Sequence, residues 1–307
     1  MSPRHLLTVR QLSTADIARI LDRAGELKSH PRTAGSQRPL GGKILGLLFD
    51  KTSTRTRVSF EAAMAHLGGT SLFLPAGELQ LKRGESIADT ARVLSRYLDA
   101  LVIRTYGHER IEQWAAESAV PVINGLTDRH HPCQALGDLL TIRERFGALA
   151  GLKLAFIGDG NNVAHSLIEA AAKTGLAIDV ACPKGHEPDP RIVEAARIDA
   201  RSTGARIEIV RDPRGAAIGA DILYTDVWVS MGQEKEARAR TKKFKAYQIN
   251  AKMLAAAKPS AIVMHCLPAH RGQEITAEVM DGKQSAVWDQ AENRLHIQKA
   301  ILEWLLG

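Results

Sequence analysis

The chain has 307 residues, of which 45% are hydrophobic and 24% charged, and such a length corresponds to roughly two domains of about 150 residues each. This composition excludes a disordered, collagen-like or coiled-coil chain. Its apolar runs are far shorter than the ~20 residues of a membrane span. The first residues lack the apolar core of a secretory signal, so neither membrane association nor secretion is expected.

The formal net charge is +7, from 41 Lys and Arg against 34 Asp and Glu. A basic excess suits nucleic acid, a membrane surface or a small anionic substrate. No run of five basic residues occurs, and only 5% of residues are aromatic, too few for an obvious base-stacking platform. We therefore favour an anionic small-molecule substrate over nucleic acid.

The three cysteines, Cys133, Cys182 and Cys266, are widely spaced and form no Cys-x-x-Cys motif. This spacing argues against a disulfide framework and against a structural zinc site. It predicts a reducing compartment, and therefore a cytoplasmic location.

Short apolar runs, closed by polar residues or glycine, alternate along the chain with longer amphipathic segments. Such runs are typical of strands that are buried on both faces. The first half offers four predicted strands, at 43–49, 70–74, 100–104 and 121–124, and the second half offers five, at 152–157, 177–181, 207–210, 221–225 and 261–265.

Amphipathic helices are predicted around these strands. The first has an apolar stripe from Ile17 to Leu27, with Ser13 or Thr14 as its N-cap. The last covers residues 291–307. Between them lie predicted helices at 58–67, 87–98, 131–146 and 167–174, of which the last ends at Gly175.

This alternation predicts an α/β fold with two similar-sized domains, each a parallel sheet flanked by helices. The stretch Gly147–Gly151 is the best domain boundary. Because ligands of such sheets bind beyond the carboxyl ends of the strands, we expect the active site in the interdomain cleft.

The strongest local signal is Asp50-Lys51-Thr52-Ser53-Thr54-Arg55-Thr56-Arg57, which follows a predicted strand and precedes a predicted helix. A cap at Ser53 or Thr54 would direct the free N–H groups and the positive end of that helix towards a ligand. Hydroxyl donors and Arg55 would complete a site for phosphate or another oxyanion. The spacing of a Walker P-loop is absent. A capped helix with surface arginines is the alternative.

Two further candidates lie in the first half. Arg104 ends the predicted strand 100–104, where it is either a ligand contact or a surface charge. His131-Pro132-Cys133-Gln134 opens a helix, and Pro132 suits a first turn. His131 and Gln134 share one face of that helix and could hold a polarised carbonyl. A helix start with a solvated glutamine is equally compatible with the sequence.

In the second half, Gly158-Asp159-Gly160-Asn161-Asn162 follows a predicted strand and opens a helix. The segment resembles half of a dinucleotide fingerprint, but Val163 stands where the third glycine is required. A nicotinamide-binding function therefore remains the weaker alternative. We favour a tight turn that presents Asn162 to the cleft.

The segments that begin at Asp226 and His265 follow the last two predicted strands. A carboxylate and a hydroxyl in Asp226–Gly232 could receive an amine and an α-amino acid head group. Adjacent residues of a strand point to opposite faces, so a Cys/His dyad is not expected from His265 and Cys266. A buried structural cysteine is the alternative. Among all these candidates, Arg294 alone does not follow a predicted strand.

Together these segments resemble the aspartate/ornithine carbamoyltransferase family over essentially the whole chain. Ser-Thr-Arg-Thr-Arg at 53–57 and His-Pro-Cys-Gln at 131–134 are similar to the signatures with which the family binds carbamoyl phosphate. Asp226 with Ser230-Met231-Gly232, and His-Cys-Leu-Pro at 265–268, are similar to signatures of the ornithine-specific branch.

The resemblance implies a carbamoyl phosphate-binding domain over 1–147, with a C-terminal helix 291–307 packing back on it, and an ornithine-binding domain over 148–290. It implies transfer of the carbamoyl group from carbamoyl phosphate to the δ-amine of L-ornithine in arginine biosynthesis. A carbamoyltransferase acting on another amine, such as putrescine or acetylornithine, is the alternative. The resemblance also implies a homotrimer with shared active sites, and neither a cofactor nor a metal.

The family's site residues can be carried over position by position. Those implied for carbamoyl phosphate are Ser53, Thr54, Arg55, Thr56, Gln80, Arg104, His131, Gln134 and Arg294. Those implied for ornithine are Asn162, Asp226, Ser230, Met231, Cys266 and Leu267. Catalytic roles are implied for Arg104, His131 and Cys266, with Cys266 as a candidate proton acceptor rather than a nucleophile.

Overall fold

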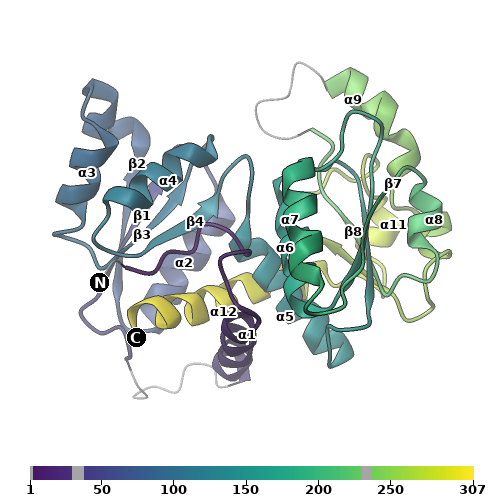
Figure 1. The fold of residues 1–307 in the computed structure, drawn as a ribbon, viewed down its shortest axis with the longest axis horizontal. Helices are drawn as coiled ribbons and strands as arrows, with labels where there is room; N and C mark the ends of the chain where they lie inside the picture. Colours follow the sequence, from purple (N-terminus) through teal and green to yellow (C-terminus); the bar gives the residue numbers. More distant parts are fainter. Residues whose placement is uncertain (1–2, 30–37, 230–236) are drawn as a thin grey trace. The chain divides into compact units, whose positions relative to one another are not determined.

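A computed structural model describes residues 3–29, 38–229 and 237–307 of the chain. The chain divides into unit 1, which comprises Met1–Leu140 and Asn293–Gly307, and unit 2, which comprises Thr141–Glu292. Each unit contains one wholly parallel sheet (Figure 1). The predicted α/β fold with two parallel sheets is confirmed.

The sheet of unit 1 has the order β2-β1-β3-β4. Its strands begin and end within two residues of the predicted ones. They are β1 (Ile44–Phe49), β2 (Thr70–Pro75), β3 (Ala100–Arg104) and β4 (Val122–Leu126). The two central strands are almost wholly buried, as the unbroken apolar runs predict.

The helices of unit 1 are α1 (Thr14–Ser29), α2 (Thr54–His66), α3 (Ile87–Leu94), α4 (His108–Glu117) and the greater part of α5 (Pro132–Phe146) and α12 (Val287–Leu306), with the 3₁₀ turns η1 (Ala76–Glu78) and η2 (Gln80–Arg83). Figure 1 draws α12 beside α1, and Arg23 of α1 donates from Nε to Glu303 of α12 at 2.5 Å. These contacts bring the end of the chain into unit 1.

Four helix limits differ by more than one residue from the sequence prediction. The helix predicted over 167–174 begins at Asn162, directly after its cap Asn161. The second helix begins at Thr54 rather than Val58, because its polar first turn is capped by Ser53. The last helix begins at Val287 rather than at 291, because Val287 is buried and the amide of Gln290 already donates to Ala286 O at 2.9 Å. The helix predicted over 87–98 ends at Leu94.

The sheet of unit 2 has the order β7-β6-β5-β8-β9. Its strands match the predicted ones within one residue: β5 (Lys153–Ile157), β6 (Ala177–Ala181), β7 (Ile207–Val210), β8 (Ile222–Thr225) and β9 (Ile262–His265). One side carries α6 (Asn162–Thr174) and α7 (Pro190–Ala200), and the other carries α8 (Pro213–Ala217), α9 (Ala237–Phe244), η4 (Lys245–Tyr247), α10 (Ala251–Leu254) and α11 (Ala277–Met280) (Figure 1).

The turn between β5 and α6 is the tight connection that the glycine pattern predicts. The side chain of Asn161 caps α6 by accepting from the amides of Val163 and Ala164, at 3.0 and 3.2 Å. A Cβ on Gly160 would lie 2.2 Å from the nitrogen of Pro188, so only glycine fits there. At the far end, α6 stops at Gly175 with a φ of 75°, as predicted.

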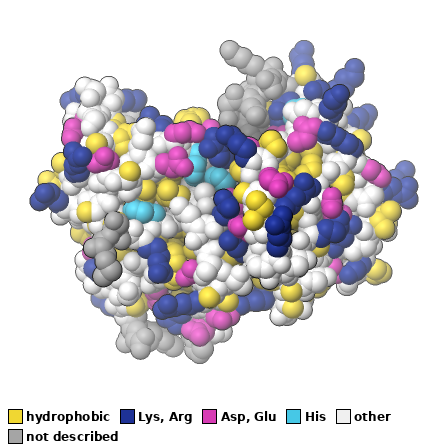
Figure 2. All heavy atoms as spheres, viewed as in Figure 1, with side chains coloured by type: hydrophobic (Ala, Val, Ile, Leu, Met, Phe, Trp, Pro, Cys, Tyr) yellow, Lys and Arg dark blue, Asp and Glu magenta, His cyan; other side chains and the backbone are white. Residues whose placement is uncertain are grey.

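Lys and Arg side chains are spread over the face seen in Figure 2, with Asp and Glu between them. This distribution agrees with the absence of a basic run in the sequence. Among the described helices, none combines the length and the apolar composition that crossing a membrane requires.

Candidate functional site

The first candidate site is the N-terminus of α2, directly after β1. Ser53 has an extended backbone, and its hydroxyl oxygen accepts from the amide of Thr56 at 3.3 Å and donates to Thr56 Oγ1 at 3.1 Å. Thr54 and Arg55 are exposed, whereas Thr56 is buried. The first turn carries no acidic residue, so no carboxylate of the helix offsets its positive end. Free amides, hydroxyls and a guanidinium therefore meet where an anion is favoured.

Three arginines from distant parts of unit 1 lie close enough to His131 to act on its charge. Arg104 ends β3, where it is paired in register with Phe49 at the end of β1. The pKa of His131 lies well below its ordinary value, first because the ring is buried and then because Arg294, Arg104 and Arg55 repel a proton. The ring is consequently neutral near pH 7, and it can donate a hydrogen bond without adding charge to the cluster.

Gln134 links this cluster to the interior of α5. Its Oε1 accepts from Arg294 Nη1 at 2.5 Å, and its Nε2 donates to Asp138 Oδ1 at 2.8 Å. All three side chains are buried. A Cβ on Gly137 would lie 3.3 Å from Arg294 Cδ, so glycine lets α12 bring its arginine close to α5. The structure thus places Arg294 beside Gln134 and near His131.

Lys51 of the first motif is buried, whereas Gln80 of η2 is exposed. Lys51, to which the sequence analysis gave no role, is buried with its ammonium 4.1 Å from the centre of the Tyr106 ring. Its pKa is lowered, first by burial and then by Arg104. Gln80 is exposed in η2. A hollow of about 520 Å³ near these turns is lined by Asp50, Ala76, Gly77, Leu81, Lys82, Tyr106 and Arg110.

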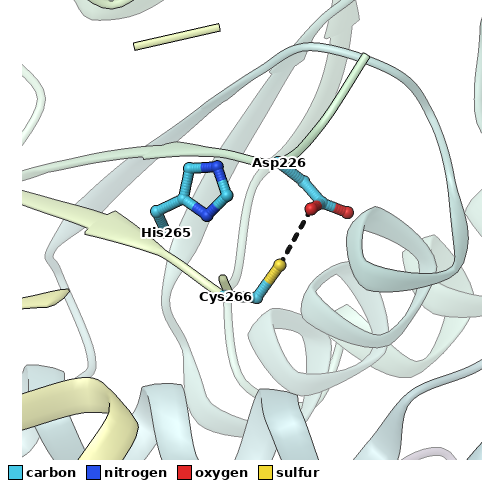
Figure 3. Close-up of side chains that lie close together, drawn as sticks. All are labelled: Asp226, His265 and Cys266. Carbon is cyan, nitrogen blue, oxygen red and sulfur yellow. Dashed lines mark hydrogen bonds between the residues drawn. The ribbon is translucent and has the colours of Figure 1, made fainter. Parts of the chain in front are cut away.

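The second candidate site lies in unit 2, where β8 and β9 end (Figure 3). The Cys266 thiol donates to Asp226 Oδ1 at 2.9 Å, and the amide of Val227 donates to the same oxygen at 2.8 Å. Asn161 Nδ2 donates to the other oxygen at 2.7 Å. The Asp226 carboxylate is therefore fixed by an amide, a side-chain amide and a thiol.

His265 is turned to a different set of partners. Its Nδ1 accepts from the amide of Leu267 at 2.8 Å, and its Nε2 lies 3.1 Å from Glu274 Oε1. Since Nδ1 accepts, Nε2 is the nitrogen that carries a hydrogen, and it donates a hydrogen bond to Glu274 Oε1. Both ring nitrogens are engaged, in agreement with the expectation that His265 and Cys266 do not form a nucleophilic dyad. Leu267 is held at a φ of 59°, a left-handed conformation that non-glycine residues rarely adopt.

Asp226, His265 and Cys266 offer possible metal-ligand atoms within 4.8 Å of one another. A metal at these atoms would have to displace the hydrogen bonds of His265 to Leu267 or Glu274, so the arrangement fits a hydrogen-bonded loop better than a metal centre.

Of the other residues predicted to bind ornithine, Asn162 lies at the start of α6, and two fall outside the part of the chain that the structure describes. Asn162 is half-buried as the first residue of α6, and its neighbour Asn161, which the sequence analysis missed, makes the contact with Asp226. An Asn after a Gly-Asp-Gly turn is a common cap, and this signal could have pointed to Asn161. Ser230 and Met231 lie outside the described residues.

Comparison with known proteins matches both halves of the chain. The family model for the carbamoyl phosphate-binding domain of aspartate/ornithine carbamoyltransferase covers residues 4–144, and that for the Asp/Orn binding domain covers residues 150–305. The chain belongs to the aspartate/ornithine carbamoyltransferase family. The resemblance noted from the sequence is confirmed.

Two relatives show how similar this carbamoyltransferase is to known proteins over its whole length. The ornithine carbamoyltransferase of Symbiobacterium thermophilum is 53% identical over 304 residues, which are 99% of this chain and 98% of the relative. The anabolic enzyme of Pyrococcus furiosus is 51% identical over 307 residues, which are 100% and 98% of the two chains.

Solved structures agree with these relatives. The ornithine carbamoyltransferase structure from Pyrococcus furiosus superposes with a TM-score of 0.96 at 51% identity, covering 100% of this chain and 98% of that one. The structure of the Thermus thermophilus enzyme superposes with a TM-score of 0.90 at 42% identity, covering 100% of both chains.

Proposed function

We propose that this carbamoyltransferase transfers the carbamoyl group of carbamoyl phosphate to the δ-amine of L-ornithine, giving L-citrulline and phosphate. The observation that carries the substrate assignment is full-length similarity at 53% identity to a relative named ornithine carbamoyltransferase. The anchored Asp226 carboxylate beside Cys266 adds support, because it offers an acceptor where an amino acid can be held.

Carbamoyl phosphate is held in unit 1. Its phosphate, which carries about two negative charges, is bound by the amides and hydroxyls of Ser53–Thr56 together with Arg55, Arg104 and Arg294. A hydrogen bond to a charged group contributes about 1.5–3 kcal/mol, so this donor set is well suited to a dianion. Gln80, which is exposed in η2, serves the site of a neighbouring subunit.

The chemical step is attack of the amine on the carbamoyl carbon. Negative charge develops on the carbonyl oxygen, where Thr56, Arg104 and neutral His131 act as donors. One such donor is worth about 2.7–4 kcal/mol of transition-state stabilisation. The new C–N bond forms as the C–O bond to phosphate breaks, and the departing phosphate takes the proton that the amine releases.

The amine must lose its charge before it attacks. An alkyl ammonium with a pKa near 10.4 is only about 0.04% neutral at pH 7, a penalty of roughly 4.6 kcal/mol. The positive charge of the arginines that hold carbamoyl phosphate lowers the pKa of the attacking amine. Cys266 is the candidate that helps to remove its proton, by accepting it as the thiol's own proton passes to Asp226 Oδ1. Asp226 orients the amino acid, since its oxygens are already engaged by Asn161, Val227 and Cys266. Asn162, Ser230, Met231 and Leu267 complete the ornithine contacts.

The assembly and setting of the enzyme are part of the same proposal. A homotrimer would let Gln80 reach a neighbouring site, and light scattering should then give the mass of three chains of 33.4 kDa each. The three cysteines are free thiols, which favours the cytoplasm. The anabolic name of the Pyrococcus furiosus relative favours arginine biosynthesis.

The test compares two arginines of α2. Arg55→Ala should abolish measurable carbamoyl phosphate binding while the fold survives. Arg57→Ala is the matched control, because Arg57 pairs with Glu61 at 2.9 Å and lies over the Phe73 ring. A citrulline assay with ornithine, putrescine, acetylornithine and aspartate should give product with ornithine alone. Tight binding by Arg55→Ala would remove the assignment of the phosphate site.

A further inference from the structure

We propose that Asp138 is a positioning residue that sets the preference of this enzyme for a carbamoyl over an acyl phosphate. It does so by fixing the amide of Gln134 so that the amide oxygen, and not its NH₂ group, faces the donor substrate. The inference rests on the proposed function, because it assumes that carbamoyl phosphate binds beside Gln134.

The geometry leaves one orientation of the amide. Asp138 lies one helical turn after Gln134 in α5 and is fully buried. A carboxylate only accepts hydrogen bonds, so the Gln134 atom 2.8 Å away must be the NH₂ nitrogen. A guanidinium only donates, so the Gln134 atom 2.5 Å from Arg294 Nη1 must be the oxygen. Two neighbours of opposite kind therefore exclude a flipped amide.

This orientation places an acceptor among donors. Arg55, Arg104, Arg294 and the first turn of α2 offer N–H and O–H groups, which match the phosphate and carbonyl oxygens of the substrate. Carbamoyl phosphate carries its own N–H donors only on the carbamoyl nitrogen. A carbonyl oxygen has two lone pairs, so Gln134 Oε1 can accept from that nitrogen while it keeps Arg294.

Acetyl phosphate is the discriminating probe. It has nearly the shape and charge of carbamoyl phosphate, but a methyl group replaces the NH₂ group, so it leaves the second lone pair of Gln134 Oε1 unmatched. The ratio of the acetyl phosphate inhibition constant to the carbamoyl phosphate KM therefore measures this contact. Because both compounds have the same charge, changes in the electrostatics of the site cancel in the ratio.

The test uses a single variant and a swapped pair. In Asp138→Leu, no side chain at position 138 accepts from the Gln134 NH₂ group, so the amide can turn that group towards the substrate. The ratio should then fall by roughly two- to tenfold, the worth of one neutral hydrogen bond. In the double variant Asp138→Asn with Gln134→Glu, the hydrogen bond is reversed. An acceptor oxygen again faces the site and the net charge is unchanged, so the ratio should return to the original value.

Asp179→Asn is the control, since it removes another buried carboxylate from unit 2 and should leave the ratio unchanged. A fall of less than twofold in Asp138→Leu overturns the proposal, and so does a swapped pair whose ratio stays below the original value. If the single variant does not fold, the ratio of the swapped pair decides in the same way. Failure of the unmodified enzyme to form citrulline would instead refute the proposed function.

Discussion

Ser53 offers a way to separate the stability of α2 from its capacity to bind an anion. The hydroxyl both caps the helix, through the amide of Thr56, and faces the proposed phosphate site. Ser53→Ala should lower the free energy of unfolding by about 1 kcal/mol through loss of the cap. It should also weaken carbamoyl phosphate binding by up to about tenfold through loss of one hydrogen bond.

Ser53→Asp should separate the effect on helix capping from the effect on anion binding. Aspartate caps a helix as well as serine does, so the free energy of unfolding should stay close to the original value. Two unit charges about 4 Å apart repel by about 1 kcal/mol in water and about 4 kcal/mol near a protein surface. For a dianion the loss is at least about 2 kcal/mol, which corresponds to a roughly 30-fold weaker affinity.

Urea unfolding and calorimetric titration with carbamoyl phosphate measure the two quantities. Ser13→Ala is the matched control, because Ser13 Oγ accepts from the amide of Asp16 at 3.0 Å and caps α1 in the same manner. That variant should lose about the same stability and keep its affinity. A folded Ser53→Asp enzyme whose affinity stays within threefold of the original would refute the placement of the anion at α2.

Three further outcomes are expected. Cys266→Ala should lower kcat about 100-fold in the citrulline assay if the thiol helps to move the proton of the amine, and an undiminished kcat would exclude that role. The rate at subsaturating ornithine should rise up to tenfold per pH unit from about pH 6 to above pH 8, as the free amine titrates; a rate independent of pH would contradict this. The pKa of His131 is lowered in the folded protein, so below about pH 6.5 the unfolded chain binds more protons and stability falls by up to about 1.36 kcal/mol per pH unit. Urea unfolding of His131→Gln between pH 6.5 and 5 should therefore show a shallower dependence than that of the original protein, and an equal slope would count against a neutral buried His131.

The alternation of apolar runs was sufficient to predict every strand of both sheets within two residues, because buried parallel strands are nearly continuous apolar segments. Helix starts were harder to predict. The first turn of α2 is polar and is defined by a cap at Ser53, so an apolar stripe that begins at Val58 cannot locate it. The beginning of α12 at Val287 was missed for a similar reason.

The candidate site was predictable where its residues stand in motifs, and less so where contacts join distant segments. Arg294 lies 160 positions from Gln134, and nothing in its own surroundings in the sequence indicates their hydrogen bond. The contact of Lys51 with the Tyr106 ring and the hydrogen bond of Asp138 with Gln134 were not predicted either, because both depend on burial of a charged side chain. Burial of a charged side chain is a property of the packed chain, which the residue type alone does not reveal.

The peptide that joins Glu187 to Pro188 fills the space beside Gly160. In dinucleotide-binding proteins the corresponding glycine lets a pyrophosphate approach the backbone. Here residues 187–188 of the same unit occupy that space, so a glycine is needed at position 160 because two loops pack closely together. A dinucleotide cofactor would have to displace this loop before it could reach the end of β5. The partial glycine fingerprint therefore reflects packing between loops. A motif search that counted only the glycines would wrongly predict a dinucleotide-binding site.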